Sequence, residues 1–344
     1  MYKTILITGG TGYVGSWVVK ELLDHGYTLR VCVRNKSNTG KFRHLEEIAG
    51  KTTGKIEIWE ADLLQKGSFN DAARGCEAIM HVASPFTLRF KDPKKDLLDP
   101  ALEGTRNVLQ AASDSGTVKK VVLTSSVAAV HGDNIDMKEQ GLAEFTEDQF
   151  NTSSSLHHQP YSYSKVMAEK EAWKIVEGQD QWKLVVINPS FVLGPALSAD
   201  SNSESLSFMK DLLGGRYHTG APDLMFGFVD VRDIARAHRL ALENDRAAGR
   251  HLISATTMGV ADLAGIIKTR YGKQFKLPMM KAPKLVLYLM GWMFGLSLKF
   301  ISRNIGHPIK INNTKSIREL GLTYTPIEKT VEDMVDQMVD MKMV

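Results

Sequence analysis

The sequence predicts an α/β fold in which a doubly wound parallel sheet is followed by a smaller, mostly helical C-terminal lobe. Strand-like and helix-like segments alternate through the first two thirds of the 344 residues, as expected when helices cover both faces of a parallel sheet. A glycine-rich turn, Gly9-x-x-Gly12-x-x-Gly15, separates the first strand from the first helix. After Pro189 the alternation loosens into a long polar loop and a largely helical stretch.

The elements can be placed in order from their apolar spacing. Strands are predicted at residues 2–8, 28–34, 55–62, 77–84, 119–126 and 182–190. Helices are predicted at residues 16–26, 40–50, 68–75, 99–116 and 162–177, and a strand-plus-helix unit at 227–244. We expect a dinucleotide-binding domain at 1–190, to which 226–254 returns, and a substrate-binding lobe made of 191–225 and 255–344. A site between the two parts would follow the rule that ligands bind where the strand order of a doubly wound sheet reverses.

Composition argues against several classes of protein. The 43 basic and 39 acidic residues give a net charge of +4, too weak and too evenly spread for a nucleic-acid partner. Two cysteines, Cys32 and Cys76, argue against a disulfide framework and fit a reducing, cytoplasmic location, and we expect no signal peptide. His157 and His158 stand in a polar loop without cysteines or acids at ligand spacing, so no metal site is predicted.

One uncharged stretch bears on membrane association. Residues 285–298 contain no charge, but these 14 residues are short of the roughly 20 needed to span a bilayer. A buried or substrate-facing helix is therefore expected rather than shallow membrane association. We expect a small-molecule ligand and a monomer or homodimer.

The glycine turn predicts a dinucleotide site. Glycine reaches positive φ and lets another backbone or a phosphate approach closely. The helix that follows offers free N–H groups and a positive dipole end to an anion. A tight turn without a ligand would explain one or two glycines, but not the four between Gly9 and Gly15.

The end of the second strand favours NADP over NAD. An acid here would bind the free 2′-hydroxyl of the adenosine ribose and repel a 2′-phosphate, whereas this strand ends in Arg34, with Lys36 and Lys41 following. Arginine can hold a phosphate with two hydrogen bonds. A solvated basic turn is the alternative. Asp62, at the end of the third strand, could accept from an adenine amino group or serve as a turn acid.

The strongest catalytic signal is Tyr161, four residues before Lys165 in a helix that Pro160 can begin. This spacing places both on one face, where an ammonium should lower the pKa of the phenol and make it a useful acid. An exposed Tyr/Lys surface is the alternative. Ser126, at the end of a strand, could bind a substrate carbonyl. The G-x-S-x-G elbow of a serine hydrolase is absent.

The motifs "TGGTGYVG", "VRN", "ADLL", "HVASP", "LTSS", "YSYSK" and "NPSFVLGP" occur in this order. Together they resemble the extended short-chain dehydrogenases/reductases, and within them the dihydroflavonol-4-reductase-like group of carbonyl and aldehyde reductases. The similarity covers most of the chain and is most specific up to about Pro195. It implies a Rossmann-type fold, NADP(H) as cofactor and reduction of a small-molecule carbonyl substrate.

The resemblance also implies roles for individual residues. Tyr161 would be the acid, Lys165 would modulate it and contact the nicotinamide ribose, and Ser126, more than Ser125, would anchor the carbonyl. The implied cofactor-binding residues are Gly9, Thr11, Gly12, Tyr13, Val14, Gly15, Arg34, Lys41, Asp62, Leu63, Val82, Ala83, Ser84, Thr124, Tyr161, Lys165, Pro189, Ser190, Phe191, Val192 and Ser205. The candidate substrate residues are Ser84, Phe86, Ser126, His131 and Tyr161, although a loop histidine without a ligand is the simpler interpretation of His131.

One departure from the group bears on the substrate. The stretch after the serine strand, "VAAVHGDNIDMKEQG", differs from that of plant flavonoid reductases, so a broader aldehyde or ketone is expected instead of a flavonoid. A hydroxysteroid dehydrogenase and a nucleotide-sugar epimerase or dehydratase remain alternatives, the second disfavoured by the apolar run at 285–298. A non-catalytic NADP-binding sensor would not need Ser126, Tyr161 and Lys165 together.

Overall fold

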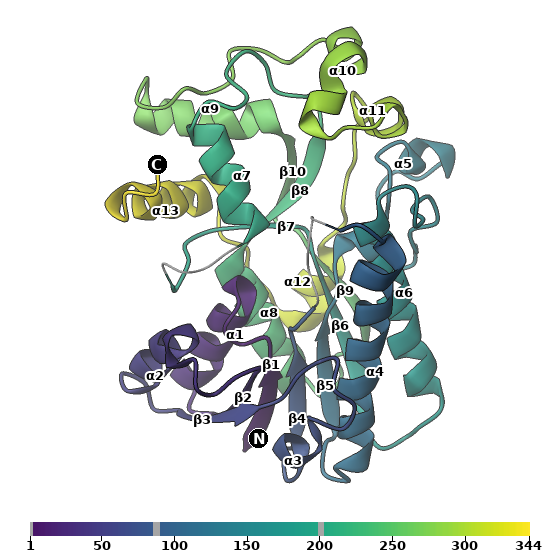
Figure 1. Cartoon of the computed structure of the whole chain (residues 1–344), viewed down its shortest axis with the longest axis vertical. Helices are drawn as coiled ribbons and strands as arrows, with labels where there is room; N and C mark the ends of the chain where they lie inside the picture. The colour runs from purple at the N-terminus through teal and green to yellow at the C-terminus, as the bar shows by residue number, and fades with distance from the viewer. Residues whose placement is uncertain (1–2, 85–89, 199–202) are drawn as a thin grey trace.

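A seven-stranded parallel sheet forms the larger part of the molecule (Figure 1). The computed structural model describes residues 3–84, 90–198 and 203–344. The strand order is β3-β2-β1-β4-β5-β6-β9 and every pairing is parallel. The strands are β1 (Thr4–Thr8), β2 (Thr28–Val33), β3 (Lys55–Glu60), β4 (Ala78–His81), β5 (Lys120–Thr124), β6 (Lys183–Pro189) and β9 (Gly249–Ile253). The doubly wound fold predicted from the sequence is confirmed.

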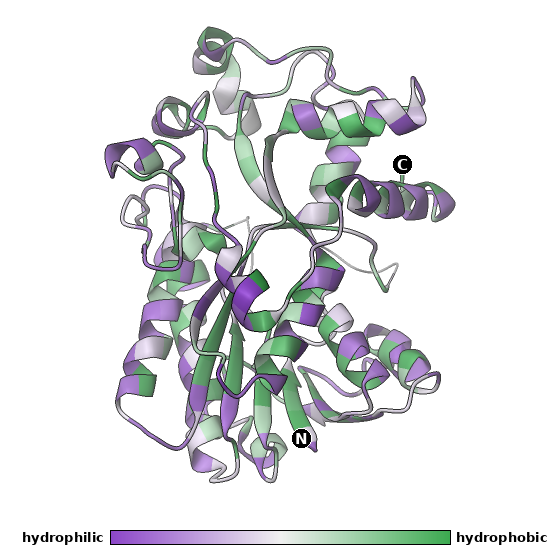
Figure 2. Ribbon diagram, turned by 180° about the vertical axis from the view of Figure 1, so that it is seen from behind, coloured by the Kyte–Doolittle hydropathy of each residue, from purple (hydrophilic) through white to green (hydrophobic). Residues whose placement is uncertain are grey.

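Helices cover both faces of this sheet because its central strands are apolar on both sides, as Figure 2 shows by hydropathy. On one face lie α1 (Tyr13–Asp24), α2 (Arg43–Ala49), α8 (Val231–Glu243) and α12 (Thr314–Leu320). The short η1 (Thr39–Lys41) directly precedes α2. On the other face lie α3 (Asn70–Ala73), α4 (Asp99–Asp114), which η2 (Lys94–Leu98) precedes, and α6 (Pro160–Glu177). Between β5 and α6 the chain forms η3 (Val127–Ala129) and α5 (Asp136–Glu139).

The smaller lobe is mostly helical, as predicted, but it is built around a three-stranded sheet of order β10-β8-β7. Its strands are β7 (Phe191–Leu193), β8 (Met225–Asp230) and β10 (Thr256–Gly259). Its helices are α7 (Glu204–Leu213), α9 (Val260–Tyr271), α10 (Lys284–Met290), η4 (Gly291–Phe294), α11 (Leu298–Asn304) and α13 (Ile327–Asp340). Within the described residues, no helix is both long and apolar enough to cross a membrane.

The segment 226–254, expected to return to the large sheet, divides between the two parts. The strand β8 pairs with β7 and β10 in the small sheet, which corrects the expectation for residues 226–230. The helix α8 then packs against α1, and β9 extends the large sheet beside β6. The sequence did not reveal this division because β7, the partner of β8, has only three residues.

The parallel sheet places the site. Since β1, β4, β5 and β6 run in the same direction, their carboxyl ends meet at one edge, which faces the smaller lobe in Figure 1. A single residue, Ser190, separates β6 from β7, so the chain passes directly from the large sheet to the small one at that edge.

Candidate active site

The glycine turn after β1 is a tightly packed connection. Gly9 has a φ of +70°, and the N–H of Gly12 donates to its carbonyl at 3.0 Å. A Cβ on Gly15 would lie 2.0 Å from the Gly9 oxygen, and a Cβ on Gly9 would lie 2.6 Å from the backbone nitrogen of Ala83. Glycine is thus required here by contact as well as by conformation.

The helix that leaves this turn has a free N-terminus. Gly12 is its exposed N-cap, and in the described chain no side chain caps it, while Thr11 and Val14 are half-buried beside it. The first N–H groups of α1 can therefore meet an anion. The Tyr13 side chain points elsewhere, because its buried hydroxyl donates to the carbonyl of Gly194 at 2.6 Å. Tyr13 can thus offer a cofactor its backbone, while its ring fixes α1 to the small lobe.

The basic residues after β2 are available for a phosphate. Arg34 and Lys41 are both exposed, and within the described residues neither forms an ion pair. Sequence reasoning missed a neighbour of the glycine turn: His44 of α2 contacts the Ser16 hydroxyl, with 3.0 Å between Nε2 and Oγ. Only the packing of α2 on α1 brings these two residues together.

The turn after β3 uses the carboxylate of Asp62 locally. One oxygen of Asp62 accepts from the N–H of Leu64 at 2.8 Å, and Ser68 bridges the Asp62 backbone. The turn-acid alternative is therefore realised for that oxygen. The carbonyl of Leu63 accepts from Asn107 at 2.7 Å, which fixes this turn to α4.

The end of β4 passes beside the glycine turn. The N–H of Ala83 donates to the Thr8 hydroxyl at 3.1 Å, and that hydroxyl also contacts Nδ1 of His81 at 2.8 Å. Val82, Ala83 and Ser84 are half-buried along this edge. Phe86 lies outside the described residues.

The two serines after β5 face different surroundings. The hydroxyl of Ser125 is buried and donates to the carboxylate of Glu169. Ser126 is half-buried, and its hydroxyl accepts from the N–H of Ala128 at 3.1 Å as the N-cap of η3. Thr124, just before them, contacts Nε2 of His238 at 2.7 Å. Ser126 therefore keeps a hydroxyl proton for a ligand, which favours it over Ser125 as the carbonyl anchor.

Tyr161 and Lys165 lie on one face of α6, as their spacing predicts. The Lys165 Nζ lies 5.7 Å from the centroid of the Tyr161 ring and donates to the hydroxyl of Ser84 at 2.9 Å. This bond joins α6 to the end of β4. Because η3 packs against α6, the serine turn lies beside the same helix.

The pKa of Tyr161 is raised in the structure, not lowered as the sequence predicted. Burial raises the pKa of the Tyr161 phenol above its usual value, and the carboxylate of Glu204 adds to this. Burial also lowers the pKa of Lys165 to about 8, while the charge of Glu169 acts in the opposite direction. Near pH 7 Tyr161 therefore holds its proton and most Lys165 side chains are charged.

A small cavity of about 20 Å³ lies beneath Lys165. Its polar lining comes from His81, Ser84, Thr105, Thr124, Ser125, Lys165 and Glu169. This volume accommodates about one water molecule. Sequence reasoning missed Glu169, although its position four residues after Lys165 places it on the same side of α6.

The chain at the end of β6 forms a further wall of the candidate site. Pro189 and Ser190 are buried, and the Ser190 hydroxyl has no hydrogen-bond partner among the described residues. Phe191 and Val192 are half-buried in β7. An unpartnered buried hydroxyl at this edge fits a polar ligand group, because burial without a partner is costly.

The smaller lobe contributes aromatic side chains beside this wall. The ring of Phe191 contacts those of Phe208, Phe226 and Phe228, with centroids 5.3, 5.9 and 5.8 Å away. Ser205 is buried in the first turn of α7. This wall is suited to apolar ligand groups.

His131 follows η3, and its ring stacks on Phe145 with 4.6 Å between centroids. Both ring nitrogens are buried without a hydrogen-bond partner in the described chain. Burial lowers the pKa of His131 to about 4, against the raising effect of Asp136 and Asp133, so the ring is neutral at pH 7. No group of described residues is arranged to hold a metal ion.

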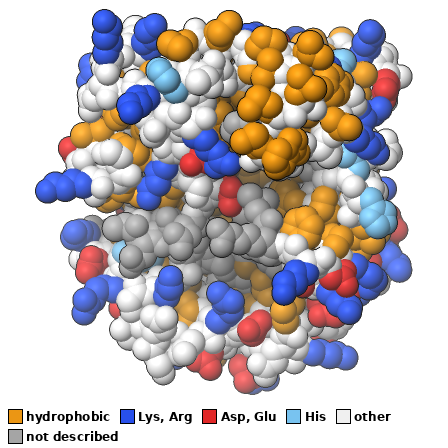
Figure 3. All heavy atoms as spheres, turned by 45° about the horizontal axis from the view of Figure 1, so that its top comes forward, with side chains coloured by type: hydrophobic (Ala, Val, Ile, Leu, Met, Phe, Trp, Pro, Cys, Tyr) orange, Lys and Arg blue, Asp and Glu red, His pale blue; other side chains and the backbone are white. Residues whose placement is uncertain are grey.

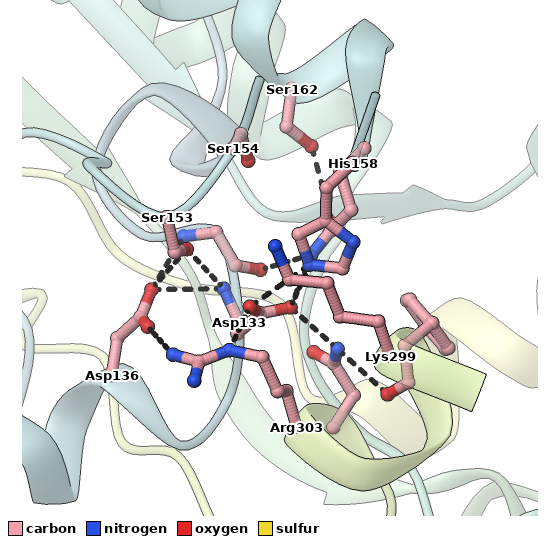
Figure 4. A network of polar contacts seen from close by, with 12 residues as sticks. Asp133, Asp136, Ser153, Ser154, His158, Ser162, Lys299 and Arg303 are labelled. Atoms are coloured by element: carbon pink, nitrogen blue, oxygen red, sulfur yellow. Dashed lines mark hydrogen bonds and ion pairs between the residues drawn. The ribbon is translucent and has the colours of Figure 1, made fainter. Parts of the chain in front are cut away.

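His158, in the polar loop before α6, belongs to a buried ionic network with Asp133 and Arg303 (Figure 4). Its Nε2 lies 2.9 Å from Oδ1 of Asp133, and Nε of Arg303 lies 2.5 Å from Oδ2. Gln159, with φ of +53°, donates to the same carboxylate at 2.6 Å directly before α6 begins. The network thus ties the start of the Tyr161 helix to α11 of the smaller lobe.

A family model described as "NAD dependent epimerase/dehydratase family" matches residues 5–253 of the chain. The chain is 33% identical to cinnamoyl-CoA reductase CAD2 of Medicago truncatula over 343 residues, covering 99% of this chain and 97% of the relative. It is 31% identical to dihydroflavonol 4-reductase of Zea mays over 335 residues, covering 97% and 86%. The solved structure of Gre2 in complex with NADPH from Candida albicans is 30% identical, with a TM-score of 0.77 and coverage of 98% and 99%.

Proposed function

The chain belongs to the NAD dependent epimerase/dehydratase family, and from this premise we propose that it is an NADP(H)-dependent reductase that converts a small aldehyde or ketone to an alcohol. The relatives named dihydroflavonol 4-reductase and cinnamoyl-CoA reductase confirm the family resemblance stated from the motifs. The observation that carries the proposed reaction is the junction of three segments. The serine turn after β5 packs on α6, the helix that carries Tyr161 and Lys165, and Lys165 bonds to Ser84 at the end of β4.

The residues present fit NADP(H). The uncapped N-terminus of α1 at Gly12 suits a pyrophosphate, and the exposed Arg34 and Lys41 suit the 2′-phosphate of the adenosine ribose. Lys165 and the buried hydroxyl of Ser190, which has no partner among the described residues, would hold the nicotinamide half. When bound, NADPH supplies the hydride for the carbonyl carbon.

The side chains of the site handle the oxygen of the substrate. The Ser126 hydroxyl donates to the carbonyl oxygen, and the Tyr161 phenol transfers its proton to that oxygen as the alcohol forms. Because the raised pKa of Tyr161, caused by burial, keeps the phenol protonated, its proton is present at neutral pH. The phenolate that remains is stabilised by the Lys165 ammonium above the ring and is reprotonated from solvent.

The aromatic wall supports an apolar substrate. Phe191, Phe208 and Phe226 are half-buried beside the carboxyl edge of the large sheet. The names of the relatives point to cinnamoyl-CoA and dihydroflavonols, whereas the stretch after Ser126 favours a broader aldehyde or ketone. We favour a broader aldehyde or ketone as the substrate, and we keep the two compound classes named by the relatives as alternative substrates to be tested.

The test follows the loss of NADPH absorbance with a panel of aldehydes, ketoesters, diketones, dihydroflavonols, cinnamoyl-CoA and steroids, with NADH in parallel. Turnover of at least one carbonyl compound with NADPH, and much less with NADH, is expected. Tight NADPH binding with no turnover on any compound would replace this proposal by a cofactor-binding protein. Conversion of a nucleotide sugar without net NADPH consumption would replace it by an epimerase or dehydratase.

A further inference from the structure

Ten large apolar side chains are exposed together on the segment 279–298 of the smaller lobe. They are two thirds of the fifteen exposed large hydrophobic side chains in the described chain. We call this surface the apolar face; it consists of Met279, Met280, Leu285, Val286, Tyr288, Leu289, Met290, Trp292, Met293 and Leu298. Figure 3 shows hydrophobic side chains gathered on the end of the molecule that α10 and α11 form. A contiguous apolar patch of this kind marks an interaction site.

This segment is held firmly with its apolar residues outward. Leu287 is the buried residue of α10 and packs with Ile301 and Ile305 of the α11 region. Lys284 donates to the carbonyl of Ile305 at 2.8 Å, which fixes α10 to the segment after α11. Trp292 nevertheless has 75% of its surface exposed, and Leu289 has 69%. The expectation that residues 285–298 are buried is therefore wrong for most of the segment.

The surrounding sequence carries charge of a single sign. Residues 263–318 contain eleven Lys and Arg and no Asp or Glu. Since the whole chain has a net charge of +4, the other 288 residues carry a net charge of −7. Some of these cations pair with acids from other segments, as Lys281 does with Asp223. Lys273, Lys276 and Lys299 are exposed and form no ion pair with a described residue.

We propose that the apolar face docks on the surface of an anionic lipid bilayer. Its aliphatic side chains would enter the boundary between headgroups and acyl chains, while the unpaired lysines would meet anionic headgroups. Trp292 and Tyr288 are of the residue types that favour this interface. In the described part of the chain no helix is long and apolar enough to span a bilayer, so the proposed association is with one leaflet.

The charge favours a lipid surface over a second copy of the chain. Two apolar faces packed on each other would bring both sets of unpaired lysines together, and like charges across an interface oppose association. An anionic bilayer turns the same lysines into a favourable contribution. The inference does not depend on the proposed reaction, because it uses none of the active-site residues.

The full chain would be sedimented with vesicles of phosphatidylcholine alone and of phosphatidylcholine mixed with phosphatidylserine, at low and high salt. We expect at least tenfold tighter binding to the anionic vesicles, and we expect salt to weaken it. The emission of Trp292 should shift to shorter wavelength on binding, because it alone among the five tryptophans has an exposed ring.

Variants separate the apolar contribution to lipid binding from the contribution of the lysine charges. The double variant Leu289→Ser/Trp292→Ser should bind at least tenfold more weakly to every vesicle, whereas Lys299→Glu should lose about tenfold on anionic vesicles alone. The matched controls are Leu64→Ser, an exposed leucine elsewhere, and Lys51→Glu, an exposed lysine elsewhere. All these positions are exposed, so unchanged thermal unfolding checks that the fold is kept.

Three outcomes would overturn the proposal. The first is that the wild-type chain fails to sediment with anionic vesicles. The second is equal, salt-insensitive binding to both kinds of vesicle. The third is a dimer in the absence of lipid that Leu289→Ser/Trp292→Ser dissociates, which would make the apolar face a contact between two copies.

Discussion

Ser125 donates a hydrogen bond to the carboxylate of Glu169, and this bond joins the end of β5 to the middle of α6. Glu169 is 1% exposed, accepts from the side-chain amide of Asn188 at 2.8 Å, and lies 2.5 Å from Nε of Arg250. The same amide of Asn188 donates to the carbonyl of Ser126 at 3.1 Å. One buried carboxylate therefore positions the serine turn against the helix that carries Tyr161.

Glu169→Gln should shift the pH profile of the reaction. Burial lowers the pKa of Lys165 to about 8 and the charge of Glu169 opposes this, so removal of that charge lowers the pKa further. Because the proposed mechanism uses charged Lys165, activity should fall as pH rises through this pKa. The alkaline limb of kcat/KM should therefore lie near pH 8 in the wild type and at lower pH in the variant. An unshifted limb would show that Glu169 acts through packing alone.

Tyr161→Phe should remove turnover while NADPH still binds. Loss of a general acid costs about 10²–10⁴-fold in rate, and the ring that packs under Lys165 is kept. The readouts are steady-state turnover and NADPH binding by fluorescence titration. Tyr163→Phe on the same helix is the matched control, with turnover expected to stay within about twofold. Near-normal turnover in Tyr161→Phe would exclude Tyr161 as the acid.

The two neighbouring serines should respond in opposite ways. Ser126→Ala should lower kcat by about 10²-fold, as expected for loss of one donor to the substrate oxygen. Ser125→Ala should mainly lower the free energy of unfolding, by about 1–3 kcal/mol, because it leaves a buried carboxylate with one partner fewer. Kinetics and thermal unfolding of both variants would decide this. A large kinetic loss in Ser125→Ala alone would reverse the two roles.

Cofactor preference should depend on Arg34 and Lys41. In the double variant Arg34→Ala/Lys41→Ala, KM for NADPH should rise about 10–100-fold, equivalent to about 1.4–2.8 kcal/mol. KM for NADH should change little, because NADH lacks the 2′-phosphate. Lys51→Ala, an exposed lysine beyond α2, serves as control. An equal rise in KM for NADPH and NADH would show that Arg34 and Lys41 do not act on the 2′-phosphate.

Asp133→Asn should destabilise the chain in a pH-dependent way. Burial raises the pKa of Asp133, but hydrogen bonds from Asn304, Arg303 and His158 outweigh it and hold that pKa below its usual value. The stabilisation is therefore present above pH 4 and is lost as pH falls through the folded-state pKa. At pH 7 the variant should lose about 3–5 kcal/mol of the free energy of unfolding. Thermal unfolding measured between pH 7 and 3 should show that the difference in the free energy of unfolding between the wild type and the variant decreases in acid. A difference that does not change with pH would contradict this account.

Local patterns in the sequence predicted the large sheet and the identity of the candidate catalytic residues. The strands of that sheet are apolar runs between helices, and the Tyr161–Lys165 spacing is a property of one helix. The turn glycines were predicted for the same reason, because Gly12 and Gly15 approach the carbonyl of Gly9 within the same turn.

The remaining features depend on contacts between distant segments. Nothing near Asp133 in the chain indicates Arg303, 170 positions away, and nothing near Tyr13 indicates Gly194. The effect of burial on Tyr161 also required the structure, because the sequence showed its cationic neighbour but not the loss of solvent. The exposure of residues 285–298 was missed because an apolar helix in the core and one on the surface have the same composition.

The path of the chain between the two sheets limits how this enzyme can be re-engineered. It crosses at Ser190 between β6 and β7, at the junction of Asp230 and Val231 between β8 and α8, and at residues 254–255 between β9 and β10. The chain also returns from α11 to α12 on the large sheet and leaves it again for α13. The smaller lobe is therefore not a single continuous segment of the chain that could be exchanged at its two ends. Transplanting a relative's lobe to change substrate preference needs matched junctions at five crossings, and the first of them lies in the wall of the candidate active site.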